Sequence, residues 1–222
     1  MMCGRYTLFA DEAEITSEFG LTHTIEGYEP SYNIAPGQNV LAIIHDGEEK
    51  RAGYLRWGLV PSWAQDEKIG YKMINARSET AHQKPSFKQL MARKRCLIIA
   101  DSFYEWKQTD ESKQPQRIQV ADRNIFAFAG LWDKWEKDGR ILFTCTMLTK
   151  DANEFMSDIH HRMPIILPKD KEDEWITPHV QAPVQAKRFL DAVEDEQFTA
   201  YSVDTYVNKA QNNDETCIQP IV

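Results

Sequence analysis

The stretch that decides the fold is residues 125–148, IFAFAGLWDKWEKDGRILFTCTML. It holds two segments rich in apolar and aromatic residues, 125–135 and 140–148, and the turn between them contains Asp138-Gly139. Segments of this composition form strands, and an Asp-Gly pair between two of them is typical of a β-hairpin. The stretch therefore predicts two antiparallel strands that are neighbours in one sheet.

Outward from this hairpin, strand-like segments outnumber helical ones. A second Asp-Gly pair, at residues 46–47, separates strands predicted over 39–45 and 51–60. A further strand, predicted over 96–107, changes character at Asp101. The remaining predicted strands are 116–120, 162–167 and 198–203, and the predicted helices are 11–19, 85–94, 151–158, 170–176 and 183–194.

Short loops join most of these strands. We therefore predict an α+β fold with a curved, mostly antiparallel, barrel-like β-sheet core flanked by short helices. No repeat, low-complexity tract or linker interrupts the chain, so we expect residues 1–222 to form a single domain.

The composition is ordinary for a soluble globular protein, with 42% hydrophobic and 27% charged residues. No apolar run approaches the roughly 18 residues of a membrane span, and no secretory signal is present. We therefore expect a cytoplasmic location and no membrane partner. The cysteines at 3, 96, 145 and 217 have no paired spacing, which indicates reduced thiols, and the apolar runs around Cys96 and Cys145 predict core positions. With neither a metal-ligand spacing nor a phosphate-binding glycine loop, no metal and no cofactor are expected.

The net charge of −8 argues against a protein that binds nucleic acid over its whole surface. Residues 84–95, KPSFKQLMARKR, nevertheless contain five basic residues and no acidic one. This segment either lines a local basic groove or forms the solvated face of a short helix, and charge patterning does not decide between the two.

Cys3 lies in Met-Met-Cys-Gly-Arg at the start of the chain. If the two methionines are removed, Cys3 carries a free α-amine beside its thiol, with pKa values of about 7.7–8.0 and about 8.5. Such a 1,2-aminothiol condenses with an aldehyde to a Schiff base, and the thiol then closes a thiazolidine ring. The alternative is a small, half-buried residue at the start of a first strand.

Two other segments place polar residues where a strand is expected. Glu105 lies between Tyr104 and Trp106, so it is either a desolvated carboxylate suited to acid–base catalysis or an exposed acid that alternates with inward aromatics. Asn75 and Arg77 share one strand face, where the amide could orient a reacting amine and the guanidinium could hold a phosphate. The alternative for this pair is a buried polar tie between loops and the sheet.

Histidines and aromatic residues beside turns complete the candidates. His160 and His161 precede an Arg-Met-Pro strand entry, and histidine is well suited to proton transfer near pH 7, although a lone histidine more often lies at the surface or in the core. Adjacent histidines make a poor zinc site. Trp63 could stack on an unpaired base, or it could pack in the core like most tryptophans.

Six short motifs occur in a fixed order along the chain. They are Cys-Gly-Arg, Tyr-Asn-Ile-Ala-Pro-Gly, Trp-Gly-Leu-Val-Pro, Ile-Asn-Ala-Arg-Ser-Glu-Thr, Phe-Tyr-Glu-Trp and Ile-His-x-Arg-Met-Pro. Together they resemble the SOS response-associated peptidase family, also called abasic site processing proteins. Each motif alone is weak, but their joint order and spacing from Cys3 to about Pro168 are specific.

The resemblance implies a function. Members of this family bind single-stranded DNA that contains an abasic site, and their N-terminal cysteine forms a thiazolidine crosslink with the sugar aldehyde. The crosslink shields the lesion during the DNA damage response, and lyase and self-peptidase activities accompany it. By this resemblance the partner is single-stranded DNA with abasic sites, the location is cytoplasmic and nucleoid-associated when crosslinked, and no obligate protein partner is expected.

The resemblance also assigns roles to residues. Cys3 would be the nucleophile, Asn75 would position the amine or the sugar, Glu105 would transfer protons during Schiff-base formation, and His160 would assist ring opening and reversal. The DNA contacts would be Arg5, Arg77 and Arg162 to phosphates, with Trp63, Asn33 and Pro36 near the bases. His161 has no assigned role.

Two questions stay open from the sequence. The family's cysteine is expected at position two, but Met2 intervenes here, so Cys3 becomes free only through a start at Met2, removal of an added Met1 or self-cleavage. The competing functions are a thiol peptidase that acts on other proteins and a non-catalytic reader of damaged DNA. A DNA crosslink that requires the free amine of Cys3 would distinguish the crosslinking function from both of these alternatives.

Overall fold

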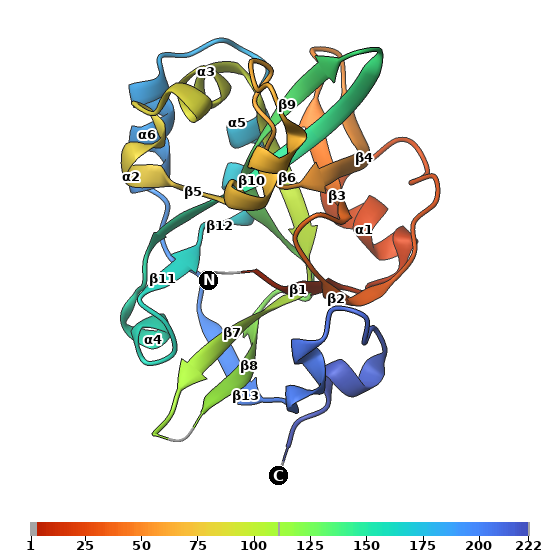
Figure 1. Ribbon diagram of the computed structural model, residues 1–222, viewed down its shortest axis with the longest axis vertical. Coiled ribbons are helices and arrows are strands. Elements are labelled where there is room, and N and C mark those ends of the chain that lie inside the picture. The colour runs from red at the N-terminus through yellow and green to blue at the C-terminus, as the bar shows by residue number, and fades with distance from the viewer. Residues whose placement is uncertain (1–3, 111, 222) are drawn as a thin grey trace.

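A computed structural model describes residues 4–110 and 112–221 of the chain (Figure 1). The hairpin predicted from residues 125–148 is present as β9 (Phe126–Lys137) and β10 (Arg140–Asp151), which pair antiparallel from Arg140–Lys137 to Met147–Gly130. Asp138 and Gly139 both have positive φ, 50° and 77°, as a type I′ turn requires. The prediction of this hairpin is therefore confirmed.

The hairpin forms part of a closed barrel. The strand order β10-β4-β3-β6-β9 returns to β10 through the hairpin itself. The three added strands are β3 (Asn39–His45), β4 (Lys50–Trp57) and β6 (Arg95–Ala100). All pairs in this ring are antiparallel except β10 with β4, which are parallel at Arg56–Thr144 and Trp57–Cys145. The expected barrel-like, mostly antiparallel core is confirmed.

A second sheet lies below the barrel in Figure 1, with the strand order β13-β8-β7-β1-β2. Its neighbouring strands are antiparallel throughout. The strands are β1 (Tyr6–Leu8), β2 (Ser31–Ile34), β7 (Ser102–Gln108), β8 (Lys113–Val120) and β13 (Phe198–Ser202).

Asp101 divides one predicted strand between the two sheets. The segment predicted as a single strand over 96–107 becomes β6 in the barrel and β7 in the second sheet. At the break, the Asp101 backbone N–H donates to the Thr7 carbonyl, and its carboxylate accepts a 2.5 Å hydrogen bond from the Phe9 N–H. These contacts bind the corner to the end of β1.

One apolar core joins the barrel and the second sheet. Phe103 of β7 packs edge-on against Phe128 of β9, with ring centroids 6.0 Å apart. Cys96 and Cys145 are fully buried in this core, as expected. A separate cluster on the opposite face of β7 contains Tyr104 and Val207 and is covered by the C-terminal segment, which includes η2 (Thr205–Asn208) and η3 (Glu215–Ile218).

Short elements flank the barrel. β5 (Asn75–Arg77) and β11 (Arg162–Pro164) both pair with β10, and β12 (Ile166–Leu167) pairs with β9. The helices are η1 (Glu67–Lys72), α1 (Glu12–Phe19), α2 (Ser78–Ala81), α3 (Pro85–Arg93), α4 (Glu154–Ser157), α5 (Lys169–Ile176) and α6 (Pro183–Asp191). Helices α2, α3 and α6 gather at the upper left of Figure 1.

Several boundaries differ from the sequence-based ones. The strand predicted over 162–167 is interrupted at Ile165, because its first part pairs with β10 and its second part with β9. The helix predicted over 151–158 is shortened because β10 continues to Asp151. Within the described chain, no helix combines the length and apolar character that crossing a bilayer requires.

Candidate functional site

Glu105 lies beside the start of the described chain. The Tyr104 N–H donates a 3.0 Å hydrogen bond to the Arg5 carbonyl, and Tyr6 pairs with Phe103 in the adjacent register position. Glu105 is the next residue of β7 after Tyr104 and is only 1% exposed. The predicted nucleophile Cys3 lies outside the described residues, two positions before Arg5. The strand that carries the candidate acid–base residue therefore runs beside the chain segment that leads from Cys3.

The burial of Glu105 decides one open alternative. An exposed acid alternating with inward aromatics would need one face of β7 to be open to water. Both faces are covered instead, since Phe103 belongs to the barrel core and Tyr104 to the C-terminal cluster. Glu105 is thus buried and not an exposed acid, whereas its role in catalysis stays a prediction.

Asn75 and Arg77 lie on β5, next to the end of the hairpin strand β10. Their register partners on β10 are Met147 and Thr149, and Ala76 between them is buried. Asn75 is half-buried, whereas Arg77 is exposed. The alternation predicted from sequence is therefore present, and the exposed Arg77 is open to a phosphate.

His160 follows α4 and precedes β11. Its Nδ1 atom lies 3.1 Å from the backbone nitrogen and 3.2 Å from the carbonyl oxygen of Arg162, so the backbone of β11 holds this side of the ring. Burial lowers the pKa of His160, and the nearby charges of His161 and Lys113 lower it further, although a backbone hydrogen bond at Arg162 acts in the opposite direction. His160 is therefore mainly neutral at pH 7.

His161 has a contact that the sequence did not indicate. Its exposed ring stacks on that of His160, with centroids 4.4 Å apart. Because a charge on His161 disfavours a second charge on His160, this neighbour helps to keep His160 neutral.

Arg162 has internal partners for the guanidinium that was expected to hold a phosphate. It is 5% exposed and forms a bidentate pair with Glu79, at 2.7 and 2.9 Å. It also donates to Asp151 at 2.5 Å and to the Thr149 carbonyl at 3.0 Å. These bonds tie β11 to β10 and to α2.

Arg5 and Asn33 are bonded to each other. Arg5 Nη1 donates a 2.7 Å hydrogen bond to Asn33 Oδ1, and Asn33 is 1% exposed. Neither side chain is presented to solvent in the way that Arg77 is. Direct DNA contact therefore remains our proposal for Arg77, whereas Arg5, Arg162 and Asn33 have structural partners.

Two exposed aromatic residues lie on the barrel side of the molecule. Trp63, which was expected near the bases, lies within the Pro61–Ala64 turn and is 56% exposed, so it does not pack in the core. Tyr71 is 75% exposed and borders Gly37, one residue after the half-buried Pro36. No sequence motif distinguished Tyr71, because its neighbourhood is a polar stretch without a recognisable pattern.

The basic segment 84–95 is divided by the fold. Lys84, Lys88 and Arg93 are exposed. Lys94 instead pairs with Asp133 at 2.7 Å, and Arg95 is buried with hydrogen bonds to backbone carbonyls. Three of the five cations are therefore available to a solvent-borne anion.

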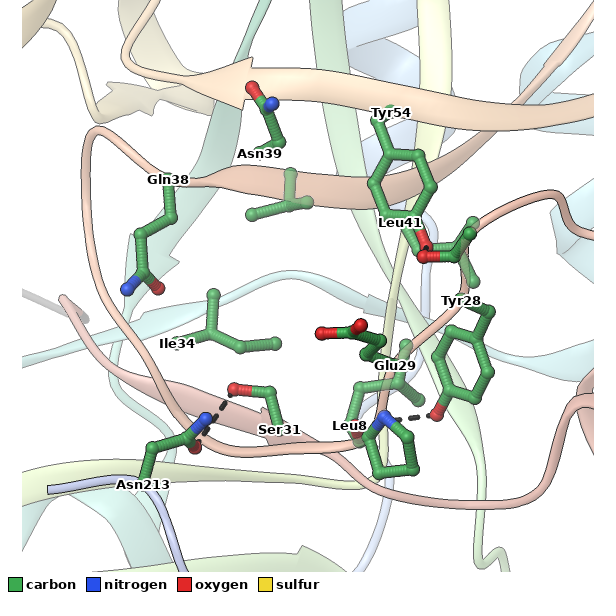
Figure 2. A pocket seen from close by; sticks show the side chains of 13 residues that line it. Leu8, Tyr28, Glu29, Ser31, Ile34, Gln38, Asn39, Leu41, Tyr54 and Asn213 are labelled. Atoms are coloured by element: carbon green, nitrogen blue, oxygen red, sulfur yellow. Dashed lines mark hydrogen bonds between the residues drawn. The ribbon is translucent and has the colours of Figure 1, made fainter. Parts of the chain in front are cut away.

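A cavity of about 260 Å³ lies between β1, β2 and the β3–β4 hairpin, and Figure 2 shows the side chains that line it. Tyr28, Tyr54 and Glu29 lie on its walls. None of the described candidate residues lines it. Elsewhere in the described chain, no group of three or more His, Cys, Asp or Glu side chains is arranged to hold a metal ion.

Comparison with known proteins gives consistent matches. The family described as "SOS response associated peptidase (SRAP)" matches residues 2–210. The abasic site processing protein YoqW of Bacillus subtilis is 50% identical, and the match covers 98% of this chain and 99% of that protein. The abasic site processing protein HMCES of Gallus gallus is 35% identical, over 87% of this chain and 67% of its own.

Solved structures show the same fold. A protein from Bacteroides thetaiotaomicron superposes with a TM-score of 0.88 at 26% identity, covering 99% of this chain and 100% of that chain. A phage-related protein from Bordetella bronchiseptica superposes with a TM-score of 0.73 at 29% identity, covering 90% and 94%.

Proposed function

This chain belongs to the SOS response-associated peptidase family, and on that premise we propose that it processes abasic sites by forming a covalent crosslink with single-stranded DNA. Its relatives at 50% and 35% identity are named abasic site processing proteins. The observation that carries the proposal within the structure is the buried Glu105, which lies on the strand bonded to Arg5. A desolvated carboxylate beside the N-terminal segment suits proton transfer to and from a terminal amine.

The chemistry follows from an aminothiol and an aldehyde. The Cys3 amine adds to the aldehyde carbon of the ring-opened abasic sugar, and loss of one water leaves a Schiff base. The thiol sulfur then adds to the same carbon, the thiol proton passes to the nitrogen, and a thiazolidine results. The overall step joins aldehyde and aminothiol with release of one water, so it needs no oxidant or reductant.

Three side chains assist this step in the proposal. Glu105 accepts and returns the protons of the amine and the departing water. Neutral His160 removes the hydroxyl proton of the closed sugar, which opens the ring and exposes the aldehyde. Asn75 orients the amine or the sugar.

DNA is held by a local surface because the net charge of −8 repels phosphates overall. Arg77 with Lys84, Lys88 and Arg93 supplies exposed positive charge, and Trp63 supplies a stacking face. Because the covalent bond then retains the DNA, a weak noncovalent affinity is sufficient for the first encounter. We place the protein in the cytoplasm, and at the nucleoid once it is crosslinked.

Release of Cys3 is part of the proposal. The amine is freed when Met2 is removed from the chain. Either translation starts at Met2 and that initiator methionine is cleaved off, or the protein cleaves its own Met2–Cys3 bond. Lyase activity follows from the Schiff base, which acidifies the sugar proton that is lost in strand cleavage.

A denaturing gel tests the function. Protein that begins at Cys3, confirmed by mass, is mixed with a single-stranded oligonucleotide that carries one abasic site. We expect a shifted band that survives boiling without borohydride and is absent for Cys3→Ala, for an acetylated N-terminus and for an oligonucleotide with a tetrahydrofuran in place of the aldehyde. Binding without any stable band would refute the crosslink and favour a reader of damaged DNA. Cleavage of other proteins by the acetylated chain would favour a thiol peptidase.

A further inference from the structure

We propose that Asn33 is a positioning residue that fixes Arg5 and, through it, the chain segment that ends in the reactive Cys3. The inference rests on the proposed crosslinking function. It replaces the base contact that the sequence suggested for Asn33 with a role inside the protein.

All the polar atoms of the Asn33 side chain are engaged. Its Oδ1 accepts the 2.7 Å hydrogen bond from Arg5 Nη1. Its Nδ2 lies 3.0, 3.1 and 2.7 Å from the carbonyl oxygens of Val207, Lys209 and Asn212. Three carbonyl oxygens share its two N–H groups, and Asn33 is 1% exposed, so its side chain is not presented to a nucleobase.

The C-terminal segment that binds Asn33 also binds Arg5. Its Nη1 also donates to the Val207 carbonyl at 2.7 Å, and its Nη2 donates to the Asn208 carbonyl at 3.0 Å. All three acceptors are neutral oxygens, and burial lowers the pKa of Arg5. Asn33 is the side chain that links the guanidinium to β2, while the two carbonyls belong to η2.

This clamp bears on the reaction because of where Arg5 lies. The Arg5 backbone is bonded to Tyr104, next to the buried Glu105, and only Gly4 separates Arg5 from Cys3. Attack on an aldehyde requires reacting atoms at about 3–3.5 Å, and a displacement of about 1 Å can cost about 100-fold in rate. Fixing both the backbone and the guanidinium of Arg5 therefore provides a rigid anchor two positions after Cys3 in the sequence.

Asn213 provides a matched control. Its Oδ1 accepts hydrogen bonds from Ser31 Oγ at 3.0 Å and from the backbone nitrogens of Tyr32 and Asn33 at 2.7 and 3.0 Å (Figure 2 shows the Ser31 bond). It therefore ties the same C-terminal segment to the same strand, without touching Arg5. Asn33→Ala and Asn213→Ala should loosen this segment alike, but only the first should release Arg5.

The experiment separates rate from binding. We measure the crosslinking rate at saturating abasic single-stranded DNA, and separately the affinity for the same strand with a tetrahydrofuran, which cannot react. Asn33→Ala should slow the rate by roughly 10-fold or more, with affinity unchanged, and Asn213→Ala should leave the rate within about 2-fold. Arg5→Met should slow the rate like Asn33→Ala, and the double variant should be no slower than Arg5→Met by more than about 2-fold.

Other outcomes overturn the proposal in distinct ways. A loss of affinity at unchanged saturated rate would make Asn33 a DNA contact. Equal slowing by Asn33→Ala and Asn213→Ala would make its role purely structural. If Asn33→Ala does not fold, Arg5→Met provides the test. An unchanged crosslinking rate of Arg5→Met at saturating DNA would refute the positioning role of Arg5 and Asn33.

A soluble aldehyde distinguishes failure of the inference from failure of the proposed function. Glycolaldehyde should form a mass adduct with the aminothiol of every variant at the wild-type rate, because a small aldehyde needs no positioning. Wild-type protein that reacts with glycolaldehyde but not with abasic DNA would refute the proposed function. Wild-type crosslinking that Asn33→Ala leaves unchanged would refute only the inference.

Discussion

Replacing Glu79 by glutamine should destabilise the protein at neutral pH, and the effect should vanish in acid. Glu79 binds the buried Arg162 through both carboxylate oxygens, whereas a glutamine offers one oxygen and no charge. The Asp151 carboxylate and the Thr149 carbonyl stay bound to the guanidinium in the variant. The change therefore weakens the link between Arg162 on β11 and Glu79 on α2, while the guanidinium keeps its other hydrogen bonds.

The size of the loss follows from exposure. Removing one partner of a fully buried ion pair costs about 3–5 kcal/mol. The Glu79 side chain is 40% exposed, so water screens the pair, and the remaining carboxylate compensates part of the loss. We therefore expect roughly 1–2 kcal/mol. For a protein of this length that corresponds to a drop in Tm of about 2–8 °C.

The pH dependence has a definite sign. Burial acts to raise the pKa of Glu79, but the hydrogen bond and charge of Arg162 outweigh it, and the net pKa is lowered. A carboxyl group with a lowered folded-state pKa contributes its stability above the unfolded pKa of about 4.3 and loses it as the pH falls through the folded value. The gap between wild type and Glu79→Gln should be full at pH 7 and should narrow progressively as the pH falls below about 4.3.

Thermal unfolding followed by circular dichroism at pH 7, 5, 4 and 3.5 measures this gap. Asp191→Asn is the control, because Asp191 pairs with Lys187 on the surface of α6, where a charge pair contributes less than about 1 kcal/mol. A gap of equal size at pH 7 and pH 3.5 would show that the charge of Glu79 is not its source. No gap at pH 7 would refute the structural role of the pair.

Three further changes have defined outcomes. In Gly70→Ala the new Cβ would lie 2.7 Å from the Gly58 carbonyl oxygen, so the free energy of unfolding measured in urea should fall by about 1–3 kcal/mol. Gly53→Ala is the control, because its new Cβ would meet no atom within 4 Å and should change this free energy by less than about 0.5 kcal/mol. Trp63→Ala should raise the Kd for unreactive single-stranded DNA by about 5- to 150-fold at unchanged Tm, the equivalent of one stacked base, and an unchanged anisotropy titration would remove Trp63 from the DNA surface. The wild-type crosslinking rate should fall as the Cys3 amine gains a proton below about pH 8. Because burial lowers the pKa of His160, a second fall should follow below the ordinary histidine value of about 6.5, and His160→Gln should be slower and lack this second step.

The local parts of the fold could be predicted because their signals are local. The Asp138-Gly139 turn and the apolar segments on either side of it specify a hairpin without reference to the rest of the chain. The parallel pair of β4 and β10, which closes the barrel, could not be predicted, because periodicity does not say which distant strands meet. The break at Asp101 was visible as a change of character, but not as a change of sheet.

The candidate site divides in the same way. Residue types suited to the chemistry could be identified from sequence, and the burial of Glu105 agrees with one of two alternatives. The partners of Arg5 could not be predicted, because the Val207 carbonyl that fixes it lies 202 residues away in sequence. The expectation that residues 1–222 form one domain, and the roles of Cys3, Asn75, Glu105 and His160, stay predictions.

The parallel seam between β4 and β10 also constrains how the protein is made. Arg56 meets Thr144 only after about ninety intervening residues have been synthesised, and closing so long a loop costs entropy before the pairing can compensate. Until then β4 has an unpaired edge, which is the kind of surface that recruits strands from other chains. We therefore expect slow folding, on the millisecond-to-second scale typical of such topologies, and the highest risk of aggregation on the ribosome before β10 emerges.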